Sequence, residues 1–311
     1  MKKVLITGGA GFIGSHITEE LLNNSREVII IDNFSNAAVT KKYLEQHTKL
    51  YCMDITDKKI IDVFHEEKPE AVIHLAAQVD VNKSMEDPLF DAKVNISGTI
   101  NLLEAAVKSR VEKFIFASSA AVYGNPLYLG VDEIHEINPV SFYGVSKYAA
   151  ESYIKTYSSL YNISYSILRY ANVYGPGQQN SPYSGVISIF INNLLKNRPP
   201  YIFGKGDQKR DFIYVKDVVR ANLLSLESSE NCILNIGTGK TTAINELYNL
   251  VSSLTSSGLR PVYSDERFGD IYESYFNCRL AKDLLRWEAE SSLEKGLLET
   301  INYYKNITNG T

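Results

Sequence analysis

The sequence predicts an α/β protein with a doubly wound parallel (Rossmann) sheet and a second, smaller α/β lobe. Short apolar runs alternate with helical patterns over the first half of the chain, and a glycine-rich turn joins the first run to the first helix. After Tyr170, loops rich in Gly, Pro, Asn and Ser separate shorter elements. A chain of 311 residues is long enough for one large core or for two lobes.

The expected strands alternate with helical crossovers. The strands are expected at Lys3–Thr7, Glu27–Asp32, Lys49–Cys52, Ala71–Leu75, Lys113–Ala117 and Ser164–Arg169, and the helices at Phe12–Asn23, Lys58–Glu66, Pro88–Lys108 and Phe142–Tyr161. Because helical crossovers join parallel strands, these strands should form a sheet that is buried on both faces. A further buried strand at Asn231–Ile236 predicts that the lobes exchange segments. Residues 1–170, with segments near 205–240, then form the first lobe, and 171–311 form most of the second.

The composition argues against several classes of protein. A formal charge of −4 and the absence of a dense Lys/Arg block disfavour nucleic acid as a partner. The sequence has no Cys-x-x-Cys and no His-x-x-x-His, so we predict no metal site, and Cys52, Cys232 and Cys278 are expected to pack in the core. No apolar run reaches membrane-spanning length and the first one is too short for a signal peptide, which predicts a cytoplasmic protein without a membrane partner.

The glycine-rich turn Gly8-Gly9-Ala10-Gly11-Phe12-Ile13-Gly14 predicts a dinucleotide site. It lies between the first strand and the first helix, where backbone N–H groups can contact a pyrophosphate. Its Gly-x-x-Gly-x-x-Gly spacing departs from the Gly-x-Gly-x-x-Gly fingerprint, so a plain strand-to-helix turn is the alternative.

Further residues at expected strand ends support a dinucleotide. Asp32 ends the second strand, where a carboxylate can accept hydrogen bonds from the adenosine ribose hydroxyls, and no arginine stands beside it. This favours NAD over NADP, although an aspartate that only shapes a turn is the alternative. Asp54-Ile55 and Ala76-Ala77-Gln78 follow the third and fourth strands, at the edge where an open α/β sheet binds its ligand.

Tyr143 and Lys147 stand four residues apart in an expected helix, so their side chains share a face. A tyrosine with a pKa of about 10 is a poor base at neutral pH, but a nearby cation favours the phenolate. Such a pair occurs by chance in many helices. The dinucleotide motifs that precede it favour the interpretation as an acid/base couple.

Together these motifs resemble the extended short-chain dehydrogenase/reductase family, especially its nucleotide-sugar branch of UDP-glucose 4-epimerase-like proteins. The resemblance spans nearly the whole chain, and the Gly-x-x-Gly-x-x-Gly spacing is this family's own form. The matching segments are Thr7–Gly14, Asp32, Asp54, His74–Gln78, Val94–Thr99, Ser118–Gly124, Tyr143–Lys147, Arg169–Gly175, Gly206–Phe212, Asn235–Gly239 and Arg267–Asp270.

The resemblance implies a role for each matching residue. Tyr143 is the expected acid/base, Lys147 lowers its pKa and holds the nicotinamide ribose, and Ser119 lies beside the reacting sugar oxygen. The cofactor NAD is expected to contact Gly8, Gly11, Phe12, Ile13, Gly14, Asp32, Asn33, Ser35, Asn36, Asp54, Ile55, Ala76, Ala77, Gln78, Asn95, Tyr143, Lys147, Tyr170 and Val173. A UDP-sugar is expected to contact Ser119, Tyr143, Asn172, Val186, Tyr201, Phe203, Arg210, Arg267, Asp270 and Ser274.

The residues after Ser119 narrow the reaction. Sugar 4,6-dehydratases of the family carry an Asp-Glu pair where this chain has Ala120 and Ala121, and UDP-glucuronate decarboxylases typically carry a Glu at the position of Ala121. An alanine methyl group transfers no proton. The resemblance therefore implies reversible oxidation at C4 and 4-epimerisation of UDP-glucose and UDP-galactose.

Ser274 bears on the size of the sugar. Forms restricted to unacetylated hexoses tend to have tyrosine at the matching position, so serine implies that UDP-GlcNAc and UDP-GalNAc are also accepted. Two alternatives remain: a UDP-glucuronate 4-epimerase or decarboxylase, and a non-catalytic NAD-sensing protein on the same fold. The family resemblance also implies a homodimer that pairs the helices near 88–108 and 142–161.

Overall fold

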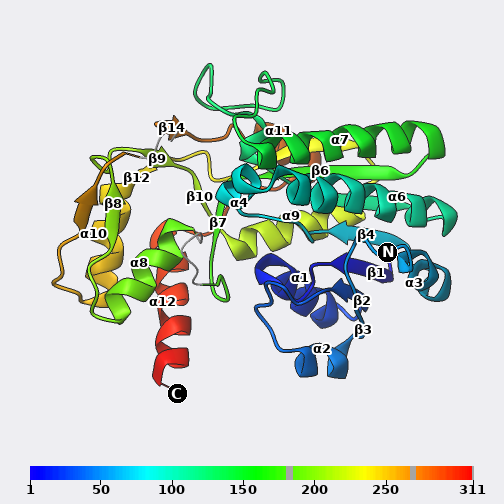
Figure 1. The fold of residues 1–311 in the computed structure, drawn as a ribbon, viewed down its shortest axis with the longest axis horizontal. Helices are drawn as coiled ribbons and strands as arrows, with labels where there is room; N and C mark the ends of the chain where they lie inside the picture. The colour runs from blue at the N-terminus through cyan, green and yellow to red at the C-terminus, as the bar shows by residue number, and fades with distance from the viewer. Residues whose placement is uncertain (180–184, 267–270, 310–311) are drawn as a thin grey trace.

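A parallel sheet of seven strands forms the core of the larger part of the molecule (Figure 1). The structure is a computed structural model that describes residues 1–179, 185–266 and 271–309. The strands lie in the order β11-β6-β5-β4-β1-β2-β3. Their bounds are β1 Lys3–Thr7, β2 Glu27–Asp32, β3 Lys49–Cys52, β4 Ala71–His74, β5 Lys113–Ser119, β6 Ser164–Tyr170 and β11 Cys232–Ile236. The strand order reverses between β1 and β4, which confirms the doubly wound sheet and marks the edge where such sheets bind ligands.

Helices cover both faces of this sheet (Figure 1). Because side chains alternate along a strand, Leu5 packs on the face covered by α3, α6 and α7, whereas Val4 and Ile6 pack on the face covered by α1 and α9. The bounds are α1 Phe12–Asn23, α2 Lys41–His47, α3 Ile60–Glu67, α4 Val81–Glu86, α5 Pro88–Ala92, the π-helical turn η1 Lys93–Ser97, α6 Gly98–Lys108, the 3₁₀ turn η2 Ala120–Val122, α7 Phe142–Tyr161, α9 Val215–Glu227 and α11 Arg279–Leu285.

A smaller group of elements lies beside the sheet and has its own hydrophobic core. This core includes Phe190, Leu247 and Ile301, all fully buried. Short strands pair here as β10 with β7, β13 with β8, and β9 with both β12 and β14. The bounds are β7 Asn172–Tyr174, α8 Val186–Leu195, β8 Tyr201–Phe203, β9 Lys209–Arg210, β10 Phe212–Tyr214, β12 Thr242–Ala243, α10 Ile244–Thr255, β13 Val262–Ser264, β14 Glu273–Ser274 and α12 Leu293–Asn309.

Some local predictions were wrong. No helix was predicted between β2 and β3, where the structure has α2, whose first turn is capped by the Thr40 hydroxyl accepting the Tyr43 N–H. The helix expected at Pro88–Lys108 is divided by η1, and α4 precedes it. Cys52 does not pack in the core, because it ends the edge strand β3 and is exposed, whereas Cys232 is buried and Cys278 is half-buried. Within the described ranges, no helix has the length and apolarity needed to cross a membrane.

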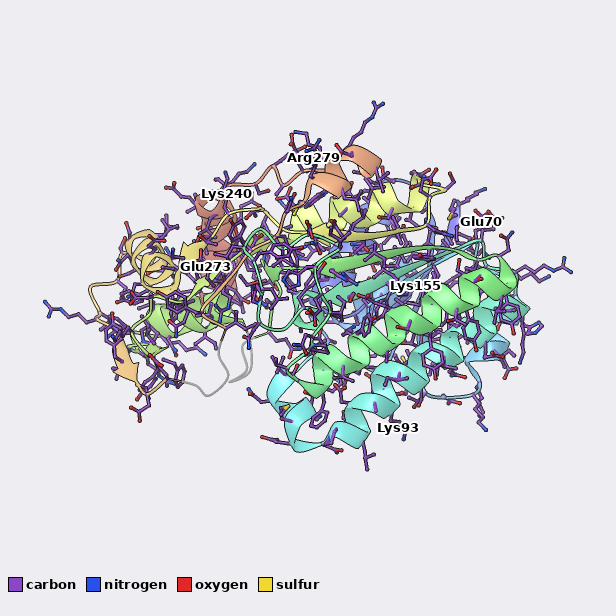
Figure 2. All side chains as sticks on the ribbon, turned by 90° about the horizontal axis from the view of Figure 1, so that it is seen from above. Glu70, Lys93, Lys155, Lys240, Glu273 and Arg279 are labelled. Carbon is purple, nitrogen blue, oxygen red and sulfur yellow. The ribbon has the colours of Figure 1, made fainter. Side chains whose placement is uncertain are left out.

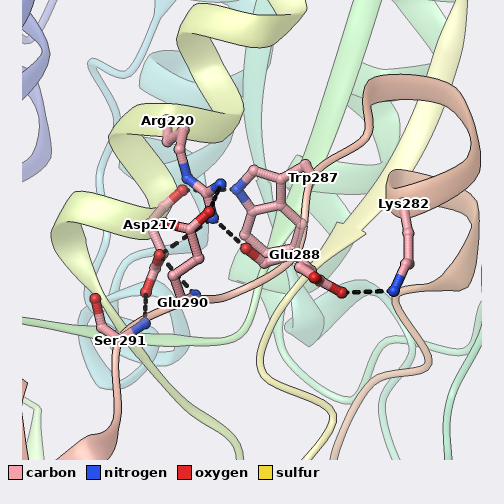
Figure 3. Close-up of polar contacts among 7 residues, drawn as sticks. All are labelled: Asp217, Arg220, Lys282, Trp287, Glu288, Glu290 and Ser291. Carbon is pink, nitrogen blue, oxygen red and sulfur yellow. Dashed lines mark hydrogen bonds and ion pairs between the residues drawn. The ribbon is translucent and has the colours of Figure 1, made fainter.

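Asp217 on α9 anchors the segment between α11 and α12 (Figure 3). Its carboxylate accepts the N–H groups of Glu290 at 3.0 Å and Ser291 at 3.1 Å. Its backbone carbonyl accepts Nε1 of Trp287 at 2.9 Å, and that indole is fully buried. The contacts attach the C-terminal part of the chain to the face of the sheet covered by α9.

Replacing Asp217 with alanine is expected to lower the free energy of unfolding by about 2 kcal/mol, because two N–H groups lose a charged acceptor. Urea denaturation followed by circular dichroism measures the change. The matched control is Asp283→Ala, since this α11 carboxylate is exposed, and a change within about 0.5 kcal/mol is expected there. An equal loss in both variants would contradict the anchoring role of Asp217.

Candidate active site

The turn between β1 and α1 forms a cradle that only glycine permits. A Cβ atom on Gly14 would lie 2.1 Å from the carbonyl oxygen of Gly8, and one on Gly8 would lie 2.7 Å from the Ala76 nitrogen. Gly8 also has a φ of +73°, which L side chains rarely adopt. No side chain caps the start of α1 at Gly11, so the first N–H groups of the helix remain available for an anion. The cradle fits the pyrophosphate of a dinucleotide.

Asp32 lies buried at the end of β2 and holds this turn. Its carboxylate accepts the N–H of Ala10 at 2.9 Å and the N–H of Phe34 at 2.7 Å. Burial raises the pKa of Asp32, although these two hydrogen bonds oppose the shift. Each carboxylate oxygen can accept more than one hydrogen bond, so these contacts are compatible with the predicted contact to the ribose.

The other predicted cofactor residues gather at the carboxyl edge of the sheet. Asn33 donates to Asp54 Oδ2 at 2.7 Å, and the Gln78 N–H donates to Asn95 Oδ1 at 2.9 Å. The Ser35 N–H donates to the Asn33 side chain, and the Tyr170 hydroxyl hydrogen-bonds Asn222. The remaining positions are Phe12 and Ile13 at the start of α1, Asn36 near Gly11, Ile55 packed against Gly98, Ala76 and Ala77 after β4, and Val173 on β7.

The start of α7 brings Tyr143, Lys147 and Ser119 together. The Ser141 hydroxyl caps the helix by accepting the Gly144 N–H at 3.1 Å. The Lys147 ammonium donates to the Ala117 carbonyl at 2.9 Å and lies 5.8 Å from the centroid of the Tyr143 ring. The Ser119 hydroxyl, at the end of β5, lies near enough to the Tyr143 phenol to oppose the rise of its pKa. The three side chains predicted for catalysis therefore converge.

Burial sets the pKa values of both Tyr143 and Lys147. Burial raises the pKa of Tyr143 to about 12; the hydrogen bond from Ser119 opposes this shift, and the charge of Asp91 adds to it. Burial also lowers the pKa of Lys147 to about 8, against the charges of Asp91 and Glu151. Desolvation therefore dominates the pKa of the phenol in the protein without cofactor, and the role of Lys147 in lowering it stays a prediction.

A cavity of about 220 Å³ lies in the smaller group of elements. Its walls include five of the predicted substrate residues: Asn172, Val186, Tyr201, Phe203 and Arg210. Ser274 on β14 stands opposite Arg210 on β9, outside the lining of this cavity. Arg267 and Asp270 lie outside the described residues.

Sequence reasoning missed other walls of this cavity. They are Tyr174, Gln178, Gly185, Ile187, Ile202, Gln208, Phe212 and Ile244. The apolar members look like ordinary core residues in the sequence, but Gln208 stands two residues before Arg210 in a matching segment and could have been found. Its Nε2 donates to the Phe203 carbonyl at 2.7 Å, while its buried Oε1 has no hydrogen-bond partner among the described residues. This oxygen is an acceptor suited to a donor on a ligand.

Comparisons with known proteins agree with this geometry. Residues 4–237 match the NAD dependent epimerase/dehydratase family. A putative UDP-glucose 4-epimerase of Methanocaldococcus jannaschii is 46% identical, over 97% of this chain and 98% of its own. The structure of a UDP-glucose 4-epimerase of Thermotoga maritima with UDP-glucose superposes with a TM-score of 0.95 at 41% identity, over 98% of this chain and 99% of its own.

A second solved structure is that of a UDP-N-acetylglucosamine 4-epimerase of Methanobrevibacter ruminantium, in complex with UDP-N-acetylmuramic acid. It superposes with a TM-score of 0.93 at 36% identity, over 98% of this chain and 99% of its own. The family match covers the glycine cradle, Asp32 and the residues that converge at α7. This chain belongs to the NAD dependent epimerase/dehydratase family and has the extended short-chain dehydrogenase/reductase fold.

Proposed function

We propose that this protein is a UDP-hexose 4-epimerase that interconverts UDP-glucose and UDP-galactose with bound NAD. One observation carries the proposal: Tyr143, Lys147 and Ser119 converge at the carboxyl end of β5, on the same edge of the sheet as the glycine cradle, while Ala120 and Ala121 follow without a proton-transferring group. The similarity to enzymes named UDP-glucose 4-epimerase, over nearly the whole chain, supports it.

Each side chain has one task in the proposed mechanism. Tyr143, as phenolate, removes the proton of the sugar 4-hydroxyl, and Ser119 donates to and accepts from the same oxygen. Bound NAD⁺ supplies the redox chemistry at C4, and its positive ring favours the phenolate. Lys147 contributes a second positive charge and a donor for the nicotinamide ribose. After the 4-keto sugar has turned over, Tyr143 returns the proton to its oxygen.

The substrate must be held by its nucleotide so that the hexose can turn. We propose that Arg210 contacts the diphosphate as a forked cation and that Asn172 hydrogen-bonds the nucleotide or sugar. The cavity lined by Tyr201, Phe203 and Gln208 is the proposed site of the nucleoside, and the Gln208 Oε1, without a hydrogen-bond partner among the described residues, is its proposed acceptor. Arg267 and Asp270 stay predicted substrate contacts.

Incubation of the purified protein with a panel of UDP-sugars tests this proposal, with products identified by NMR and mass spectrometry. We expect UDP-glucose and UDP-galactose to interconvert without a change in mass. Conversion of UDP-glucuronate alone would favour the alternative enzymes, since decarboxylation loses a carbon and epimerisation conserves mass. Binding of NAD with no turnover of any UDP-sugar would favour the NAD-sensing protein.

Ser274→Tyr is expected to remove activity on UDP-GlcNAc while activity on UDP-glucose remains. We propose that wild-type Ser274 leaves room for the acetamido group, and a tyrosine ring would fill that room. Steady-state rates on both substrates measure the change, and Ser274→Ala, which keeps the space open, is the matched control. Absence of wild-type turnover on UDP-GlcNAc, or its survival in Ser274→Tyr, would contradict the assignment.

Three broader predictions accompany this function. We propose a homodimer through α7 and the neighbouring α5–η1–α6 run, which Figure 2 shows lying side by side, with Lys93 and Lys155 as markers. Exposed Leu89, Val145 and Leu160 on these helices support an apolar contact, and analytical ultracentrifugation tests it. The division into lobes near residue 170 and a cytoplasmic location also stay predictions.

A further inference from the structure

The helix face that carries Tyr143 and Lys147 continues to Glu151, one turn further along α7. Glu151 is fully buried and accepts the Ser118 hydroxyl at 2.5 Å. Each member of this face therefore contacts the end of β5: Tyr143 contacts Ser119, Lys147 contacts the Ala117 carbonyl, and Glu151 contacts Ser118. The three contacts set how α7 lies against the strand that carries the catalytic hydroxyl.

Arg169 on β6 keeps the Glu151 carboxylate paired. Its Nε donates to Glu151 Oε1 at 2.9 Å and its Nη2 to Oε2 at 2.6 Å, a two-point ion pair. Arg169 is only 3% exposed, so neither charge is in water. A third donor of Arg169, Nη1, donates to the Tyr123 hydroxyl at 2.8 Å. Tyr123 directly follows η2, the turn after Ser119. Losing one member of such a pair leaves a buried charge without compensation.

Within the part of the chain that the structure describes, the charges of Asp91 and Glu151 act on the Lys147 ammonium. Asp91 on α5 is 1% exposed, and its carboxylate accepts the side-chain amides of Gln78 and Asn95, each at 3.0 Å. His74 on β4 stays neutral, because burial lowers its pKa to about 3, with a further contribution from Lys147. Asp91 and Glu151 both oppose the burial that lowers the pKa of Lys147. Of these two carboxylates, Glu151 is the one on the same helix as Lys147.

We propose that Glu151 is a positioning residue that docks the Tyr143–Lys147 face of α7 on β5 and supplies a counter-charge to the Lys147 ammonium. Arg169 pairs with both oxygens of this carboxylate and fixes its direction. The effect of Glu151 on the rate of turnover rests on the proposed epimerase function. Its effect on the protonation of Lys147 is independent of that function, because protonation can be measured without turnover.

The direct test is NMR titration of the NAD-loaded protein with ¹³Cε-labelled lysine, in which Lys147→Arg assigns the signal. Glu151→Gln is expected to lower the titration midpoint of Lys147 by about one pH unit, because a carboxylate is lost and Arg169 remains unpaired. Glu67→Gln is the matched control: this buried glutamate on α3 pairs with Lys49 at 2.7 Å and should leave the midpoint unchanged. An unchanged midpoint in Glu151→Gln would overturn the proposal.

A double variant provides the same test if Glu151→Gln alone does not fold. Glu151→Gln with Arg169→Met removes both charges, and its Lys147 midpoint is still expected below that of the wild type, since Glu151 acts on Lys147 directly. In the pH profile of kcat/KM, the decline at alkaline pH should move to lower pH by the same amount as the titration midpoint of Lys147. A shifted Lys147 midpoint with an unshifted kcat/KM profile would overturn the role of Glu151 in the reaction. A wild type without epimerase turnover would refute the proposed function and leave the NMR result standing.

Discussion

Replacing Tyr143 with phenylalanine is expected to lower kcat for UDP-glucose about 10²- to 10⁴-fold, the range typical of a lost general acid/base. The substitution removes only the phenol hydroxyl, whose pKa is influenced by Ser119. The ring and its place on α7 remain, so NAD and UDP should bind with nearly unchanged affinity. A coupled assay of the UDP-glucose formed from UDP-galactose measures kcat, and isothermal titration calorimetry measures both affinities.

Tyr153→Phe is the matched control, because Tyr153 lies on the same helix with 42% of its side chain exposed. Its kcat should stay close to that of the wild type. Unchanged turnover in Tyr143→Phe would exclude the phenol as the acid/base. An equal loss in both variants would instead indicate a general effect on α7.

The second large effect is expected from Gly14→Ala, which should weaken NAD binding about 10- to 100-fold, the equivalent of 1–3 kcal/mol of overpacking. The added methyl group would lie 2.1 Å from the Gly8 carbonyl oxygen and 2.8 Å from the Gly9 Cα. Because both are backbone atoms, the cradle itself must move. Calorimetry with NAD measures the loss, and circular dichroism checks that the fold is kept.

Gly258→Ala provides the same change of residue at a harmless position, since a Cβ atom there would meet nothing within 4 Å. Its affinity for NAD should equal that of the wild type. If Gly14→Ala bound NAD as tightly as Gly258→Ala, the glycine cradle would not be the pyrophosphate site.

The sequence predicted the long elements well because their ends carry local signals. The bounds of α1 and α7 agree with the predicted Phe12–Asn23 and Phe142–Tyr161, and Ser141 before α7 is a typical capping residue. The short helix α4 was missed, because six residues give little periodicity. It is stabilised from outside: Ser84, which lies on it, accepts the backbone N–H of Tyr143 at 3.0 Å.

The residues of the candidate site also divide into those with local sequence signals and those without. Gly8, Asp32, Tyr143 and Lys147 stand in short motifs with fixed spacing, so they could be found before the structure. The pairing of Glu151 with Arg169 joins two elements across the core, and local spacing does not reveal it. The raised pKa of Tyr143 also depends on how the whole domain buries the phenol, which the sequence does not show.

The most direct test of the central claim follows the hydrogen at C4. UDP-galactose labelled with deuterium at C4 is converted in ordinary water, and the product is analysed by NMR and mass spectrometry. Oxidation and reduction at C4 with bound NAD predicts UDP-glucose that keeps its deuterium at C4, because that hydrogen never exchanges with water. Loss of the deuterium to solvent, or a product other than the C4 epimer, would contradict this mechanism.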